Sequence, residues 1–137
     1  MTAVPISQGS TSSKVLLWTG RALSGLFVAF MIFDVGIKLA RLPMVETTGA
    51  QMGLPAGSGF AIGVMEGLIL ALYLIPRTTV LGAVLVTALM GGTAAIHFHE
   101  GNPLFSHILF GPYLAVFAWG GLWLRNERLR QLFPIVR

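Results

Sequence analysis

The sequence predicts an all-α integral membrane protein, a four-helix bundle with up-down-up-down topology. Hydrophobic residues make up 55% of the chain and charged residues only 10%, whereas soluble domains carry about 25% charged residues. The apolar residues gather in four long stretches, and a membrane helix needs about 20 mostly apolar residues, within a range of roughly 17–25. Membrane β-strands would instead alternate in polarity over about 10 residues, and no such alternation is present.

The first apolar stretch, residues 15–39, is expected to be a retained helix. The apolar core of a cleaved signal spans only about 7–15 residues, and this stretch is longer. The serine-rich residues 1–14 are expected to form a flexible tail, and residues 15–137 a single transmembrane domain. A loop over 44–59, rich in glycine and proline, then leads to the second stretch, residues 60–75.

The rest of the chain is expected to form two further helices. Pro76 predicts a tight turn, so the helices over 60–75 and 80–96 are antiparallel neighbours. A Gly-Asn-Pro sequence that begins at Gly101 is a strong turn signal. It precedes the fourth stretch, residues 108–124.

The basic residues divide unequally between the two ends of such a bundle. With an even number of crossings, both termini lie on one side, together with Lys14, Arg21, Arg77, Arg125, Arg128, Arg130 and Arg137. The other side carries only Lys38 and Arg41. The positive-inside rule therefore predicts a multi-pass protein of the cell inner membrane with cytoplasmic termini. Because topology explains the basic excess, no nucleic-acid partner is expected, and the basic residues of 125–130 are candidates for contact with anionic lipid headgroups.

Three charged residues lie at membrane depth within the predicted helices. Asp34 and Glu66 each lie about seven residues inside the outer end of their helix, which is roughly 10 Å deep at 1.5 Å per residue. Lys38 lies one turn from Asp34 on the same helix face. Each such charge costs about 2.5–3.5 kcal/mol, so we expect Lys38 to pair with Asp34 or, across the bundle, with Glu66. The cluster is either a structural ion pair that sets helix register, or a polar pocket that opens outward and binds a ligand or moves protons.

Glu66 distinguishes these two interpretations. If Lys38 pairs with Asp34, Glu66 is left without a partner, and a lone buried carboxyl group favours its protonated form. Such a group suits a proton donor, or a hydrogen-bond donor to a quinone carbonyl. The candidate ligand-binding residues are Lys38, Glu66, His97, Phe27 and Met31. The candidate catalytic residues are Glu66, Asp34 and Lys38.

The positions of the histidines and the absence of cysteine limit which cofactors the chain could bind. His97 and His99 point about 200° apart on a helix, so they share a metal only where the chain is extended. For these two and His107 we favour hydrogen bonds to loop backbone or helix ends over metal or haem ligation, with His97 the best functional candidate. The chain has no cysteine, which excludes disulfides, thiolate catalysis and iron–sulfur clusters. A redox role would need a quinone, another cofactor or a partner protein.

Several motifs occur in a recognisable order between Arg21 and Leu124. They are Arg21, Lys38-Leu39, Met52-Gly53-Leu54-Pro55, Gly63-x-x-Glu66, Pro76-Arg77, Gly82 and Gly91-Gly92-Thr93-Ala94-Ala95 with His97. This order resembles the DoxX-like family of small four-helix bacterial membrane proteins. The resemblance implies that Lys38, Glu66 and His97 match recurring polar positions of the family, whereas Asp34 and Val35 depart from its pattern. Some relatives are membrane subunits of quinone-linked oxidoreductases or of complexes that handle thiol stress, and most have no assigned activity.

Three functions therefore stay open. The first is a membrane subunit of an oxidoreductase system that docks a redox partner or binds a quinone or another hydrophobic ligand. The second is a non-catalytic accessory or assembly protein that binds other membrane helices through its glycine faces. The third is a small membrane enzyme that acts on a hydrophobic substrate with Glu66 as general acid, although no nucleophile–base pair supports it. The sequence also leaves open whether the chain forms a homo-oligomer.

Overall fold

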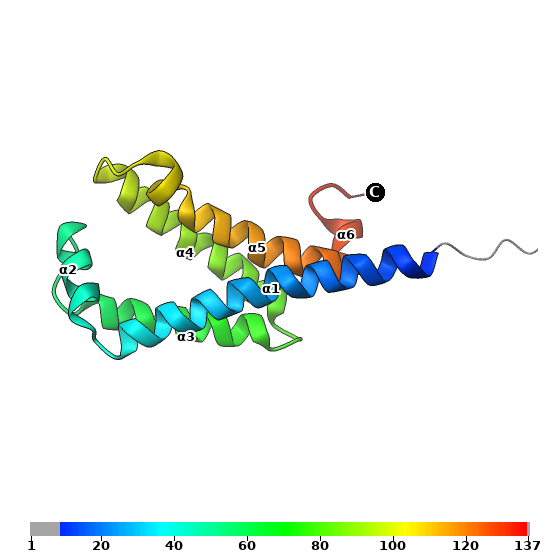
Figure 1. Cartoon of the computed structure of the whole chain (residues 1–137), viewed down its shortest axis with the longest axis horizontal. Helices are drawn as coiled ribbons and strands as arrows, with labels where there is room; N and C mark the ends of the chain where they lie inside the picture. The colour runs from blue at the N-terminus through cyan, green and yellow to red at the C-terminus, as the bar shows by residue number, and fades with distance from the viewer. Residues whose placement is uncertain (1–8, 137) are drawn as a thin grey trace, which may run out of the picture.

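The computed structural model describes residues 9–136, which form helices and connecting turns with no β-strand among them (Figure 1). The all-α prediction is confirmed for this part of the chain. The helices are α1 (Gly9–Leu39), α2 (Pro43–Gln51), α3 (Ser58–Leu74), α4 (Thr79–His99), α5 (Phe110–Arg125) and α6 (Glu127–Leu132), with a π-helical turn, η1 (Leu104–Ile108), before α5. The predicted tail overlaps α1, because residues 9–14 are helical; residues 1–8 lie outside the described part.

Three helical segments are long and apolar enough to cross a bilayer: residues 12–39, 79–99 and 104–125. With 17 residues, α3 is shorter, roughly 26 Å at 1.5 Å per residue, against a hydrocarbon thickness of about 30 Å. Large apolar side chains are exposed along the helices, among them Leu68 at 65% and Val116 at 69%. Lipid solvates such surfaces and water does not, so the structure is that of a multi-pass membrane protein.

Each of the four long helices packs against two of the others. α1 contacts α3 and α5, and α4 contacts the same two helices. Phe27 and Met31 of α1 are fully buried, together with Val86 of α4 and Ala118 of α5. The ring of Phe27 meets the edge of Tyr73 from α3 with their centroids 5.0 Å apart. The apolar core thus lies midway along the molecule and separates its two ends.

The two ends differ in what they carry. In Figure 1, α2 and the α4–α5 connection lie at one end, and the α3–α4 turn and α6 lie at the other. We call the first the α2 end. We call the second the basic end, because it carries Arg21, Arg77, Arg125, Arg128 and Arg130.

The prediction of a loop over 44–59 was wrong for its first half, because residues 43–51 form the nine-residue helix α2. Pro43 is the first residue of α2, a position where the missing N–H costs no hydrogen bond. The chain turns after α2 at Gly53, whose φ of 70° suits glycine. Glu46 then fastens α2 to the start of α3, since its Oε2 accepts a hydrogen bond from the Gly57 N–H at 3.0 Å. α2 is therefore held across the end of the bundle.

Two glycines of α3 let α1 approach closely. A Cβ atom added at Gly63 would lie 2.7 Å from the Cβ of Lys38, and one at Gly67 would lie 3.5 Å from Val35 Cγ1. Small residues at helix contacts increase van der Waals contact where lipid supplies no hydrophobic drive. The absent side chain at Gly63 thus lets the Lys38 backbone lie against α3.

We predict that Gly63→Ala lowers the stability of the purified protein by about 1–3 kcal/mol, the usual cost of an extra carbon in a packed site. Gly91→Ala is the matched control, because a Cβ there meets no neighbouring atom within 4 Å. It should leave stability unchanged or slightly raised, since alanine favours helices. Thermal unfolding in mild detergent measures both, and equal melting temperatures for the two variants would contradict the close contact of α1 and α3.

Candidate functional site

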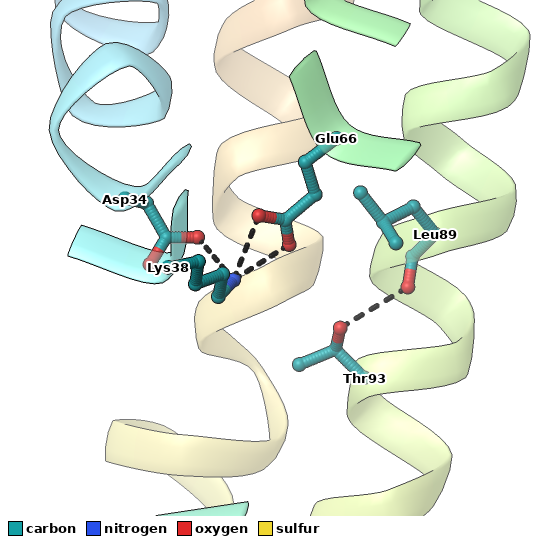
Figure 2. A network of polar contacts seen from close by, with 5 residues as sticks. All are labelled: Asp34, Lys38, Glu66, Leu89 and Thr93. Atoms are coloured by element: carbon teal, nitrogen blue, oxygen red, sulfur yellow. Dashed lines mark hydrogen bonds and ion pairs between the residues drawn. The ribbon is translucent and has the colours of Figure 1, made fainter. Parts of the chain in front are cut away.

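One lysine at the α2 end contacts two carboxylates from different helices (Figure 2). Lys38 Nζ lies 2.6 Å from Asp34 Oδ2, one turn earlier on α1. It also lies 2.7 Å and 2.8 Å from the two carboxylate oxygens of Glu66 on α3. The sequence predicted that these residues lie at one end of the bundle, and the structure brings all three together.

Of the two pairings that the sequence left open for Lys38, the structure shows both, so Glu66 is not left without a partner. An ammonium group has three N–H donors and no acceptor, and Lys38 makes three short contacts, one to Asp34 and two to Glu66. All three of these contacts go to carboxylate oxygens. The Glu66 side chain is 5% exposed, whereas Lys38 and Asp34 are 19% and 22% exposed. The most deeply buried member of the network is thus the one paired through both of its oxygens.

A cavity of about 260 Å³ lies beside this network. The three charged residues occupy one part of its wall, and the rest is mostly apolar. The other lining residues are Ile37, Met44, Val45, Thr48, Gly49, Met52, Leu54, Gly59, Ile62, Thr93 and Ile96. The hydroxyl of Thr93 donates to the Leu89 carbonyl of its own helix at 3.1 Å (Figure 2). The site is therefore an apolar chamber with one ionic wall.

α2 forms much of the chamber's outer wall. It contributes Met44, Val45, Thr48 and Gly49 to the lining. A Cβ added at Gly59 would lie 2.6 Å from Val45 Cγ1, so α2 and the start of α3 are in close contact. The helix that the sequence did not predict thus provides a large share of the candidate binding surface.

Phe27 and Met31, the two predicted apolar ligand contacts, do not line this chamber. Both are fully buried in the core between the helices. Phe27 lies about two turns and Met31 about one turn before Asp34 on α1, toward the basic end. The apolar contacts of the chamber come instead from α2 and from the outer ends of α3 and α4.

His97, the third predicted polar contact, lines a separate cavity of about 190 Å³. This cavity also takes in His107 and Glu100, and it shares Thr48 and Met52 with the chamber. The two imidazole rings lie 5.7 Å apart, edge to face. His99 is 87% exposed and lies outside both cavities. Within residues 9–136, no three His, Cys, Asp or Glu side chains are grouped so that they could share a metal ion.

The tautomer of His97 follows from its neighbour. Asn102 Nδ2 lies 3.1 Å from His97 Nδ1, and an amide nitrogen can only donate. His97 Nδ1 therefore accepts, and the proton of the neutral ring is on Nε2. The histidine is bonded to a loop side chain, rather than to the backbone or helix end that the sequence suggested.

A second polar network, at the basic end, was missed by the sequence analysis. It joins Arg125, Ser24 and Tyr73, three residues far apart in the chain. Ser24 is buried on α1 and Tyr73 is buried on α3. For Arg125 the sequence predicted only a contact with anionic lipid headgroups, as one of the basic residues of 125–130. The sequence feature that could have predicted this network is the presence of polar side chains near the same end of three neighbouring helices.

The ionic wall can act as a hydrogen-bond acceptor for a ligand. Lys38 is already bonded to both carboxylates, whereas Asp34 Oδ1 receives no hydrogen bond from any residue of the described chain. The two carboxylates and one ammonium carry a net charge of −1 unless a carboxyl group keeps its proton. The chamber thus offers an uncharged ligand mostly apolar walls beside two carboxylates, and one oxygen of Asp34 has no hydrogen bond from a described residue.

The comparisons with known proteins agree with the motif order. A model of the DoxX-like family matches residues 22–121. The matched region contains the ionic wall and most of the chamber lining. No curated protein and no solved structure matches the chain.

We predict that Lys38→Met destabilises the protein by about 3–5 kcal/mol, because removing one partner leaves buried charges without compensation. The triple variant Lys38→Met, Asp34→Asn and Glu66→Gln should recover much of this loss, since no buried charge remains. Lys14→Met is the control, because Lys14 is an exposed lysine of the same helix. Unfolding in mild detergent measures all three. A Lys38→Met protein as stable as the Lys14→Met protein would show that the ionic contacts are not formed.

Proposed function

The chain belongs to the DoxX-like family, and from this membership we propose that it is a membrane subunit of an oxidoreductase system that binds a hydrophobic ligand in the chamber at its α2 end. The single observation that carries the proposal is a cavity of about 260 Å³ with mostly apolar walls and a buried ionic wall. An engineered cavity of about 150 Å³ accommodates benzene. The chamber is therefore large enough for a substituted six-membered ring.

The proposed topology is a four-helix up-down-up-down bundle in the bacterial inner membrane. Three segments have the length and composition of membrane spans, and α3 lies at the short limit of about 17 residues. The basic residues of the basic end outnumber Lys38 and Arg41 at the α2 end, which favours cytoplasmic termini by the positive-inside rule. The chamber would then open toward the periplasmic side.

The hydrogen-bonding pattern favours a ligand that donates. A quinone carbonyl needs a donor, and Lys38 is already bonded to Asp34 and Glu66. A quinol hydroxyl needs an acceptor, and Asp34 Oδ1 is available. We therefore propose a quinol, or another hydroxylated ring compound, as the preferred occupant.

The redox partner is proposed to be another protein. The chain has no cysteine for thiol exchange, and the described residues hold no group of three metal-ligating side chains. A bound quinol would supply two electrons and two protons when oxidised. Asp34 and Glu66 would accept its hydrogen bonds and orient the ring, and the electrons would need an acceptor outside this chain.

A second candidate function is a non-catalytic accessory protein. The observation that favours it is the bonding of Lys38 to carboxylates on α1 and on α3, since an ammonium that joins two helices in this way sets helix register without any ligand. The two functions differ in whether Asp34 affects ligand binding. Stability measurements alone do not separate them.

We predict that a short-chain benzoquinol raises the melting temperature of the purified protein more than the matching benzoquinone does. Asp34→Asn should reverse this preference. The one amide oxygen of asparagine would bond to Lys38, which leaves its NH₂ group to donate to a carbonyl. Thermal shift under anaerobic conditions, with each ligand titrated, measures the effect.

Glu127→Gln is the matched control for this experiment, because it neutralises a carboxylate at the opposite end of the molecule. It should leave the preference for quinol unchanged. The ligand proposal fails if neither compound shifts the melting temperature, or if Asp34→Asn and Glu127→Gln respond alike. The accessory function would then be the better account of the ionic network.

A further inference from the structure

A second and larger cavity lies at the basic end. It measures about 670 Å³ and is bounded by α1, by the α3–α4 turn and by the junction of α5 and α6. Its lining combines polar and apolar groups. The lining residues are Ser24, Gly25, Val28, Tyr73, Leu74, Pro76, Thr79, Val80, Leu122, Arg125, Asn126, Glu127 and Arg128. None of them belongs to the chamber at the α2 end.

A chain of directed hydrogen bonds fixes the guanidinium of Arg125 in this cavity. Tyr73 donates its single hydroxyl proton to the Ala118 carbonyl at 2.8 Å. The Ser24 hydroxyl, 3.0 Å from the Tyr73 oxygen, must therefore donate to it. Ser24 Oγ in turn accepts from Arg125 Nη2 at 2.9 Å. Arg125 Nε also donates to the Gly121 carbonyl at 2.9 Å.

Arg125 keeps donors for a ligand. A guanidinium has five N–H groups, and the two bonds to Ser24 and Gly121 leave three that no residue of 9–136 accepts. The preset orientation lowers the entropy that a bound anion would otherwise cost, because a planar guanidinium loses little freedom on forming further bonds. The buried relay thus prepares an anion-binding group.

The other charges of the lining leave it positive. Arg128 makes no hydrogen bond or ion pair to another described residue, and Glu127 is the single acid of the lining. Arg125 and Arg128 against Glu127 give a net charge of +1. Arg130 does not line this cavity, and its Nη1 donates instead to the carbonyls of Trp123 and Leu124 at the end of α5.

The same cavity has an apolar side. Val28, Leu74, Val80 and Leu122 line it, so an occupant meets a guanidinium at one part and hydrocarbon at another. A free phosphate would gain nothing from these apolar residues. An amphiphile with an anionic head and acyl chains satisfies both parts of the lining.

We propose that this cavity binds the phosphate of an anionic phospholipid, with Arg125 and Arg128 on the headgroup and the first acyl carbons along the apolar residues. Guanidinium and phosphate form strong, charge-assisted hydrogen bonds in a planar fork. The site is separate from the ligand chamber and does not depend on any activity there. Because Arg125 on α5 is hydrogen-bonded to Ser24 on α1, and Ser24 to Tyr73 on α3, a bound lipid would be connected to all three helices.

The test titrates the full-length protein in mild detergent with phosphatidylglycerol, with phosphatidylcholine and with inorganic phosphate, and measures bound lipid by native mass spectrometry. We expect phosphatidylglycerol to bind in preference to phosphatidylcholine, and millimolar phosphate not to displace it. Arg128→Ala should weaken phosphatidylglycerol binding about ten-fold or more, since it removes a charge-assisted hydrogen bond to the phosphate. Because Arg128 bonds to no described residue, this variant should fold normally.

Arg77→Ala is the matched control, since it removes one positive charge from the same end without touching the cavity lining. Binding by this variant should stay within about two-fold of the original protein, as expected for a screened surface charge. Equal loss in Arg77→Ala and Arg128→Ala would show a diffuse surface effect and overturn the proposal. So would equal binding of the two lipids. Displacement of the lipid by inorganic phosphate would identify a site for soluble anions instead.

Discussion

The contact of one ammonium with two carboxylates is the constraint on which the α2 end depends. Each charge at membrane depth costs about 2.5–3.5 kcal/mol on insertion scales, so Asp34, Lys38 and Glu66 are tolerated only together. Their contacts of 2.6–2.8 Å join α1 to α3 at a point where the two backbones also lie close together. Gly63 allows that approach because it carries no side chain. The ion pair, the helix contact and the cavity beside them thus form one unit.

The molecule places two unlike polar clusters on either side of an apolar core. Phe27, Met31 and Val86 fill the middle and are fully buried. The α2 end combines an ionic network with a mostly apolar chamber. The basic end combines a partly engaged guanidinium with a larger cavity of mixed lining. The two ends therefore differ in the sign of their charge and in the polarity of their cavity walls.

Much of this arrangement could be predicted from the sequence, because hydropathy and helix geometry act over short distances along the chain. Depth in the membrane and the i,i+4 spacing predicted that Asp34, Lys38 and Glu66 lie at one end of the bundle and that Lys38 pairs with one of the two carboxylates. The same approach treated Lys38 as able to serve one partner, whereas it bonds to both carboxylates. α2 was missed because nine residues with weak amphipathic character resemble a loop. The relay of Ser24, Tyr73 and Arg125 was missed because its members are 49 and 101 residues apart, and helix pairing rather than local pattern brings them together.

The central claim is that Lys38 bonds to both carboxylates at once within a lipid bilayer. Solid-state NMR on the protein in liposomes, with ¹⁵N in lysine and ¹³C in carboxyl groups, measures the dipolar couplings of the Lys38 Nζ directly. The structure predicts strong couplings from this nitrogen to the carboxyl carbons of Asp34 and Glu66 in the same sample. A coupling to Asp34 alone would mean that Glu66 lies unpaired in the membrane, which would contradict the account of the site.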